Sequence, residues 1–233
     1  MVMIRAVAFD FEGPLVNIEL VHHRAHILAA EDAGLQLSTE GAIRKIPHFI
    51  GGPDEAVARE IAEFARGVFP EFILERKRYH YARLLKSFPV KLRPGVSLVL
   101  EWLQKNEFKV MVGSLTAADQ AEFLLAKTGL DLIIGKENIV LREDVENVKP
   151  APDVWLETAR RAGVDPAEQL VFEDSPNGLI GVRDAGSIGV GVLTLYNDPT
   201  ISIRMLREGA VRIIRDWREL NISALIENLN NKL

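Results

Sequence analysis

The 233-residue sequence predicts an α/β protein, an open doubly wound parallel sheet with an inserted all-helical segment. Short apolar runs recur along the chain, helical patterns separate them from residue 108 onward, and about seventy residues after the first run contain helical patterns alone. Strands buried on both faces of a parallel sheet read as near-continuous apolar runs, and their alternation with helices implies right-handed crossovers.

The elements of the sheet follow in order from these runs. The first strand is predicted over residues 4–9, where an apolar run ends at Asp10. Further strands are predicted over residues 108–113, 132–134, 170–172, 188–193 and 211–214. Helices are predicted between them over residues 117–127, 152–162, 176–184 and 200–208, and residues 217–229 read as an amphipathic closing helix. Thr116, three residues before Asp119, is predicted to be a helix N-cap.

The stretch between the first two strands predicts a separate helical subdomain. Its helical patterns cover residues 19–33, 39–45, 54–67 and 70–86. A parallel crossover needs only about a dozen residues, so this stretch is too long for a single connection. We therefore expect a core of residues 1–16 and 88–233 and an insertion of residues 17–87. Loops at the carboxyl ends of parallel strands surround the ligand crevice, so the insertion is expected to roof the site.

Composition excludes several classes of protein. Apolar residues (48%) and charged residues (26%) are too abundant and too balanced for a disordered chain. The net charge of −5 argues against nucleic-acid and anionic-membrane partners. The absence of cysteine excludes disulfides, thiolate nucleophiles and cysteine-bound zinc. With no cleavable signal sequence and no apolar span, the expected location is cytoplasmic, while the oligomeric state stays open.

Four polar clusters stand where predicted strands end or helices begin. They occupy residues 10–13, 113–116, 148–150 and 173–175. Because the carboxyl ends of parallel strands share one edge, these clusters can converge in one crevice with at least three carboxylates, one ammonium group and one hydroxyl. Carboxylates at such short range repel one another, and a hard divalent cation such as Mg²⁺ relieves the repulsion.

These clusters resemble the four motifs of the haloacid dehalogenase superfamily. Residues 10–16, Asp-Phe-Glu-Gly-Pro-Leu-Val, are similar to the first motif, Asp-x-Asp-Gly-Thr followed by Leu or Val. Ser114 stands at the second motif and Lys149 at the third, and residues 173–178, Glu-Asp-Ser-Pro-Asn-Gly, resemble the fourth. The resemblance covers residues 4–192, includes the position of a helical cap, and points to the phosphatase and β-phosphoglucomutase-like subgroup with a Rossmann-like core.

The resemblance implies a Mg²⁺-dependent phosphatase that hydrolyses a small phosphorylated metabolite, a phosphate monoester, through a covalent aspartyl phosphate. It makes Asp10 the nucleophile and Glu12 the general acid and base. It assigns the phosphoryl group to Ser114, Lys149, Gly13 and Leu115, with Lys149 also catalytic. It assigns the metal to Asp10, the Glu12 carbonyl and Asp174, with Glu173 as a ligand or as a support through water.

Three residues depart from the family pattern. Glu12 replaces an aspartate, and its extra methylene matters because a misplacement of about 1 Å can cost about 10²-fold in rate. Pro14 replaces a threonine, and Asn17 stands where aspartate is common. Two alternatives therefore stay open. One is a phosphosugar mutase of the same family, with Arg44, Lys45 and Arg59 as grips for a second phosphate and residues 51–53 as a specificity loop. The other is a low-activity phosphate-binding protein weakened by Glu12 and Pro14.

Overall fold

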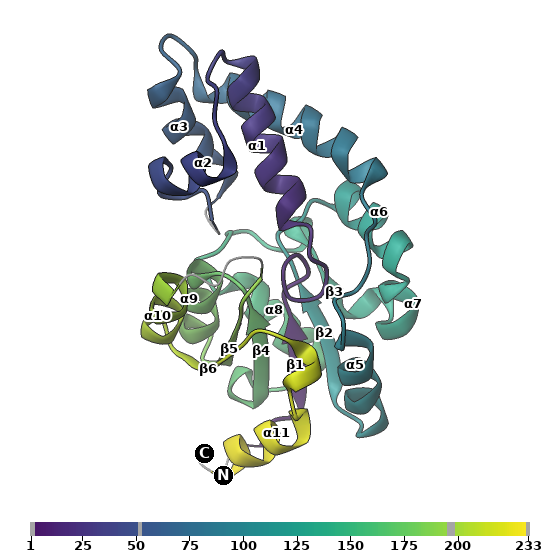
Figure 1. The fold of residues 1–233 in the computed structure, drawn as a ribbon. Coiled ribbons are helices and arrows are strands. Elements are labelled where there is room, and N and C mark those ends of the chain that lie inside the picture. The colour runs from purple at the N-terminus through teal and green to yellow at the C-terminus, as the bar shows by residue number, and fades with distance from the viewer. Residues whose placement is uncertain (1–2, 51–52, 195–198, 232–233) are drawn as a thin grey trace. The chain divides into compact units, whose positions relative to one another are not determined.

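The computed structural model of the protein describes residues 3–50, 53–194 and 199–231 (Figure 1). The chain divides into two compact units. One unit joins Met1–Asn17 to Val90–Leu233, and the other is Ile18–Pro89. We refer to them as the core unit and the helical unit.

The core unit is built on a sheet of six parallel strands, counted over the described residues, in the order β3-β2-β1-β4-β5-β6. The strands are β1 (Ala6–Phe9), β2 (Lys109–Gly113), β3 (Ile139–Val140), β4 (Gln169–Glu173), β5 (Ile188–Val192) and β6 (Ala210–Ile214). The helices of this unit are α5 (Val96–Lys105), α6 (Ala118–Thr128), α7 (Leu130–Ile134), α8 (Asp153–Ala162), α9 (Pro176–Asp184), α10 (Pro199–Arg207) and α11 (Ile222–Asn230). The open, parallel α/β fold predicted from the sequence is confirmed.

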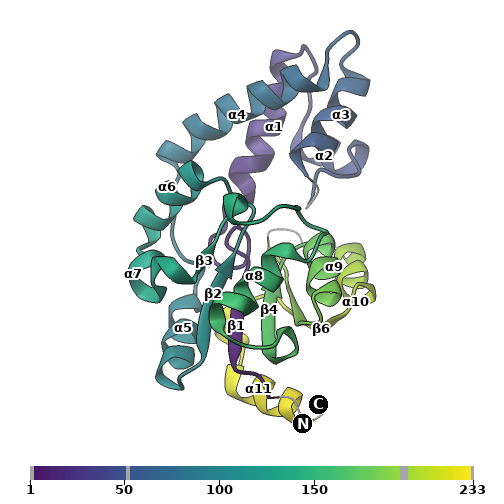
Figure 2. The same cartoon turned by 180° about the vertical axis from the view of Figure 1, so that it is seen from behind.

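Apolar side chains on both faces of the sheet explain why its strands are buried. On one face, residues of β1 to β4 pack against α8 and α9, and α8 lies behind the sheet in Figure 1 and before it in Figure 2. On the other face, the Phe9 and Phe172 rings stack with centroids 5.2 Å apart, and Trp217 lies 4.8 Å from Phe172. Each strand of the centre is thus apolar on two sides, which is the pattern that the sequence displays.

The register of the central strands brings their carboxyl ends to one level. Phe9 of β1 is paired with Val112 of β2 and with Phe172 of β4. The residues that follow each strand therefore leave the sheet at the same edge. Asp10, Ser114 and Asp174 all lie just beyond these pairs, although more than fifty residues separate them in sequence.

Two predicted elements of the core unit differ from the structure, and one helix was not predicted. The run predicted as a strand at residues 132–134 belongs to the helix α7, and the edge strand is β3, five residues further on. A run of three apolar residues fits either structure, so periodicity could not decide between them. Helix α5 was not predicted. The predicted closing helix is divided into a 3-10 turn at Trp217–Glu219 and α11, which begins where the Asn221 side chain accepts a hydrogen bond from the Ala224 amide at 3.0 Å.

The helical unit consists of α1 (Glu19–Asp32), α2 (Thr39–Lys45), α3 (Asp54–Phe64) and α4 (Pro70–Ser87). Ser38 caps α2 by accepting a hydrogen bond from the Gly41 amide at 3.0 Å. The core of this unit is aliphatic and includes Ile27, Ile61 and Ile73. Among the described residues, no helix of either unit has the length and apolar character needed to cross a bilayer.

A buried polar network lies beside this aliphatic core. Lys77 is 3% exposed and donates to Asp54 and, at 3.1 Å, to Nδ1 of His22. The other Asp54 oxygen lies 3.0 Å from Nε2 of His26. Burial lowers the pKa of His26, and the hydrogen bond to Asp54 opposes this only in part. For Asp54, burial alone would raise the pKa, but His26 and Lys77 outweigh it and hold the pKa below its usual range.

Candidate active site

The centre of the site is Asp10, the first residue after β1. Its amide donates to the Phe172 carbonyl at 2.8 Å, which extends the strand pairing by one residue and fixes the direction of the side chain. The residue is 8% exposed. Burial raises the pKa of Asp10 to about 7 against the opposing charge of Lys149, and the nearby Glu173 adds to the rise. The protein thus keeps a carboxyl group at the strand end in an environment that disfavours its charge.

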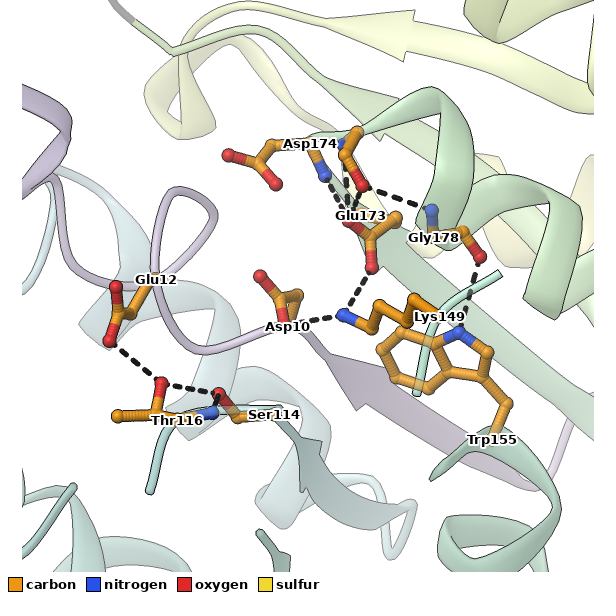
Figure 3. A network of polar contacts seen from close by, with 10 residues as sticks. Asp10, Glu12, Ser114, Thr116, Lys149, Trp155, Glu173, Asp174 and Gly178 are labelled. Carbon is orange, nitrogen blue, oxygen red and sulfur yellow. Dashed lines mark hydrogen bonds and ion pairs between the residues drawn. The ribbon is translucent and has the colours of Figure 1, made fainter. Parts of the chain in front are cut away.

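Lys149 is the cation of the site and bridges two acids. Its ammonium group donates to Asp10 Oδ1 and to Glu173 Oε2, each at 2.7 Å (Figure 3). It also lies 4.7 Å from the centre of the Trp155 ring, which supports the cation from below. Burial would lower the pKa of Lys149, but Asp10 and Glu173 outweigh burial and raise it above its usual range. The lysine therefore stays charged.

Glu173 is the last residue of β4 and Asp174 is the first residue after it, and the two acids differ in their surroundings. Glu173 is 1% exposed, and its Oε1 accepts hydrogen bonds from the Asp174 amide at 3.1 Å, the Ser175 amide at 3.0 Å and the Ser175 hydroxyl at 2.9 Å. Both of its oxygens are therefore engaged by protein donors. Asp174 is half-buried, and a Cβ atom at Gly13 would lie 1.9 Å from its Oδ2, so only glycine allows the loop after β1 to approach it.

The acids form a group that fits a divalent cation. One oxygen each of Asp10, Glu173 and Asp174 lie within 4.8 Å of one another. An all-carboxylate donor set suits hard cations such as Mg²⁺. Both Glu173 oxygens accept hydrogen bonds, one from Lys149 and the other from the loop that follows β4. The residues best able to hold the ion are therefore Asp10 and Asp174.

Ser114, Leu115 and Glu12 lie beside this group, on the loops after β2 and β1. Ser114 is 2% exposed, and its amide donates to the Val140 carbonyl at 2.9 Å. Leu115 is half-buried in the same loop. Glu12 is half-buried and accepts a hydrogen bond from the Thr116 hydroxyl at 2.7 Å. The prediction that Thr116 caps the next helix was wrong, because Ala117 occupies the N-cap position of α6 and Thr116 directs its side chain to Glu12.

Sequence reasoning missed three residues that shape the site. Thr116 holds Glu12, and Trp155 lies under Lys149 while its Nε1 donates to the Gly178 carbonyl at 3.3 Å. Arg93 donates to the Gly13 carbonyl and to the Leu193 carbonyl, each at 2.9 Å, and so fixes the loop after β1. Only Thr116 left a signal, a second hydroxyl two residues after Ser114.

The basic residues considered for a second phosphate belong to the helical unit. Arg44 and Lys45 are exposed in the last turn of α2, and Arg59 is exposed on α3. The proposed specificity loop at residues 51–53 falls largely outside the described residues, since Gly51 and Gly52 are not among them. That these residues bind a second phosphate therefore stays a prediction.

Comparison with known proteins identifies the family. The family model of haloacid dehalogenase-like hydrolases matches residues 4–186. The chain is 31% identical over 221 residues to a phosphorylated carbohydrates phosphatase of Thermotoga maritima, covering 93% of this chain and 97% of that protein. It is also 31% identical over 187 residues to the fructose-1-phosphate phosphatase YqaB of Escherichia coli, covering 80% of this chain and 95% of that protein.

A solved structure supports the same fold. A haloacid dehalogenase-like protein of unknown function from Agrobacterium tumefaciens superposes with a TM-score of 0.83 at 24% identity, covering 97% of this chain and 99% of that one. At this identity the likeness concerns the fold alone. The family match includes Asp10, Ser114, Lys149 and Asp174 and covers most of the sequence, and the chain is therefore a member of the haloacid dehalogenase-like hydrolase family.

Proposed function

We propose that the protein is a Mg²⁺-dependent phosphatase that hydrolyses a small phosphate monoester through a covalent aspartyl phosphate at Asp10. The observation that carries this proposal is the buried Asp10 carboxyl at the strand end, held at 2.7 Å by Lys149 within a group of acids that fits a divalent cation. A carboxylate, an ammonium group and a hydroxyl at one strand edge are the groups that phosphoryl transfer to a side chain requires.

In the first step an Asp10 oxygen forms a bond to phosphorus while the bond from phosphorus to the leaving oxygen breaks. Glu12 gives its proton to that oxygen, which leaves as an alcohol. Lys149 and the Ser114 hydroxyl bind the phosphoryl oxygens and stabilise the charge that builds on them. In the second step Glu12 takes a proton from water as the water oxygen attacks phosphorus. The bond between phosphorus and Asp10 then breaks, and inorganic phosphate is released.

Bound Mg²⁺, held by Asp10, Asp174 and the Glu12 main-chain carbonyl, would neutralise phosphoryl charge and favour ionised Asp10. This matters because the metal-free surroundings raise the pKa of Asp10 and so disfavour the attacking form. Glu173 supports the site by holding Lys149 at 2.7 Å and the loop after β4 through three hydrogen bonds.

The relatives suggest where to look for a substrate. Two of them are phosphatases of phosphorylated carbohydrates and of fructose-1-phosphate. We therefore propose a small phosphorylated metabolite, with sugar monophosphates as the first class to test. That the helical unit acts as a substrate-selecting cap stays a prediction.

The test is release of inorganic phosphate from a panel of sugar phosphates, with and without Mg²⁺. Asp10→Asn should abolish release, and Glu12→Gln should lower it by about 10²- to 10⁴-fold. After acid quenching, intact mass should show one phosphoryl group on the wild-type chain and none on Asp10→Asn. Full activity of Asp10→Asn would refute the covalent mechanism. Movement of labelled phosphate to a second sugar position would favour the mutase, and inactivity on the whole panel would favour the binding protein.

A further inference from the structure

Glu12, the residue that departs from the family pattern, has its carboxylate held by a neighbouring loop. The Thr116 hydroxyl donates to Glu12 Oε1 at 2.7 Å, and 104 residues separate the two in sequence (Figure 3). Thr116 is only 9% exposed, while Glu12 is half-buried. The contact therefore joins the loop after β1 to the loop after β2 at the edge where Asp10 lies.

Each hydroxyl group has one proton, and this determines which group donates each hydrogen bond around Glu12. Thr116 has one hydroxyl proton, and Glu12 accepts it. The Ser114 and Thr116 hydroxyl oxygens lie 2.8 Å apart, so Ser114 donates that bond while no phosphoryl group is bound, and its proton turns to a phosphoryl oxygen when substrate binds. The Ser114 oxygen in turn accepts from the Thr116 amide at 3.1 Å. A chain of donors thus runs from Ser114 through Thr116 to Glu12, and every donor in it has an acceptor.

The backbone of Glu12 is held in place by the turn that follows it, so only the conformation of its side chain can vary. The Gly13 amide donates to the Val16 carbonyl at 2.8 Å, and Gly13 has a φ of +96°, so the turn that carries Glu12 is closed. A glutamate has one more rotatable bond than an aspartate, and its carboxylate can occupy more positions. A β-branched residue such as Thr116 has a restricted χ1 and is suited to hold that carboxylate in one of them.

We propose that Thr116 is the positioning residue of Glu12, which compensates for the longer acid by holding its carboxylate where proton transfer to the leaving oxygen occurs. This inference rests on the proposed function, in which Glu12 is the general acid and base. It assigns Thr116 no contact with substrate and no role in capping α6, whose N-cap is Ala117.

The test compares substrates that need a proton on the leaving group with substrates that do not. An alkyl phosphate has a poor leaving group and depends on general-acid help, whereas dinitrophenyl phosphate releases a stable anion. Thr116→Val removes the hydroxyl and keeps the shape, and Thr116→Ser keeps the hydroxyl. We expect Thr116→Val to lower kcat/KM for glycerol phosphate or the best sugar phosphate by about 10- to 100-fold, the usual effect of one hydrogen bond to a charged group. The value for dinitrophenyl phosphate should stay near that of wild type, and Thr116→Ser should recover most of the loss.

A second comparison separates Thr116 from Ser114, which also loses a partner in Thr116→Val. In a Glu12→Gln background, Thr116→Val should lower alkyl-phosphate turnover no further, because the group that it positions is already absent. An equal loss on both substrates, or a full additional loss in the Glu12→Gln background, would overturn the inference and point to phosphate binding through Ser114.

The experiments distinguish failure of this inference from failure of the proposed function. If Asp10→Asn keeps full activity, the proposed function fails, whatever Thr116 does. If Asp10→Asn is inactive and Thr116→Val behaves as wild type on both substrates, only the role of Thr116 is refuted. A crystal structure of Thr116→Val gives a readout independent of activity. Displacement of the Glu12 carboxylate supports the inference, and an unchanged carboxylate overturns it.

Discussion

Removal of the Asp54 carboxylate should destabilise the helical unit more than removal of the cation that it pairs with. In Asp54→Asn, the Lys77 ammonium group, 3% exposed in the wild type, loses the carboxylate that it donates to, and His22 Nδ1 remains as a partner at 3.1 Å. Loss of one partner of a buried ion pair costs about 3–5 kcal/mol. The Asp54 side chain is 36% exposed, so water weakens the pair and we expect about 2–3 kcal/mol.

Lys77→Met is the matched control because methionine has a similar length and no charge. It leaves Asp54 with His26 at 3.0 Å and with solvent, so the expected cost is below about 1 kcal/mol. The double variant should resemble Lys77→Met, which makes the two substitutions strongly non-additive. For a chain of this size, the loss in Asp54→Asn corresponds to a melting temperature about 4–12 °C lower.

The assay is urea unfolding at neutral pH, followed by far-ultraviolet circular dichroism and by tryptophan fluorescence. All three tryptophans, at positions 102, 155 and 217, belong to the core unit, so fluorescence reports that unit and circular dichroism reports both. We expect Asp54→Asn to shift the dichroism transition more than the fluorescence transition. The paired state of Asp54 stabilises the fold above its usual pKa near 3.8, and this contribution is lost as pH falls through the lower folded value, so the two proteins should converge in acid. An Asp54→Asn protein as stable as Lys77→Met would refute the reasoning.

Two further predictions concern the core unit. Gly13→Ala should lower kcat/KM by about 10²-fold and weaken Mg²⁺ binding measured by calorimetry, because its Cβ would lie 1.9 Å from Asp174 and its φ is +96°. Gly34→Ala, also at positive φ but with open space around it, should keep full activity, and equal effects of the two would contradict the steric argument. Removal of Mg²⁺ should make stability depend on pH through Asp10, whose pKa burial raises to about 7 with Lys149 opposing. The folded chain then keeps a proton that the unfolded chain loses near pH 4, so this contribution is full below pH 4 and is lost as pH rises through 7. Mg²⁺ should therefore raise the melting temperature more at pH 8 than at pH 5.5, and an equal rise at both would refute it.

Much of the fold could be predicted because its signals are local. Buried parallel strands are apolar along their whole length, so β1, β2, β4, β5 and β6 were located to within two residues at each end. The helices of the stretch after the first strand could also be predicted, because their apolar residues recur with a helical period within each segment. Where the run was short, as at residues 132–134, the pattern fitted two structures and the prediction was wrong.

The sequence by itself determined which chemical groups stand at the ends of the strands. The acids at residues 10, 173 and 174 could be chosen as candidates because a strand end and a family motif coincide there, and the lysine at residue 149 because a family motif stands just before a predicted helix. Only the tertiary structure determined which partners each of these groups contacts. Glu173 is occupied by Lys149 and the following loop, Thr116 turns to Glu12, and Trp155 lies beneath the lysine. Glu12 and Thr116 are 104 positions apart in the chain and Glu173 and Lys149 are 24 apart, and hydrogen-bond partners at such separations depend on register and packing, which no local pattern of residues encodes.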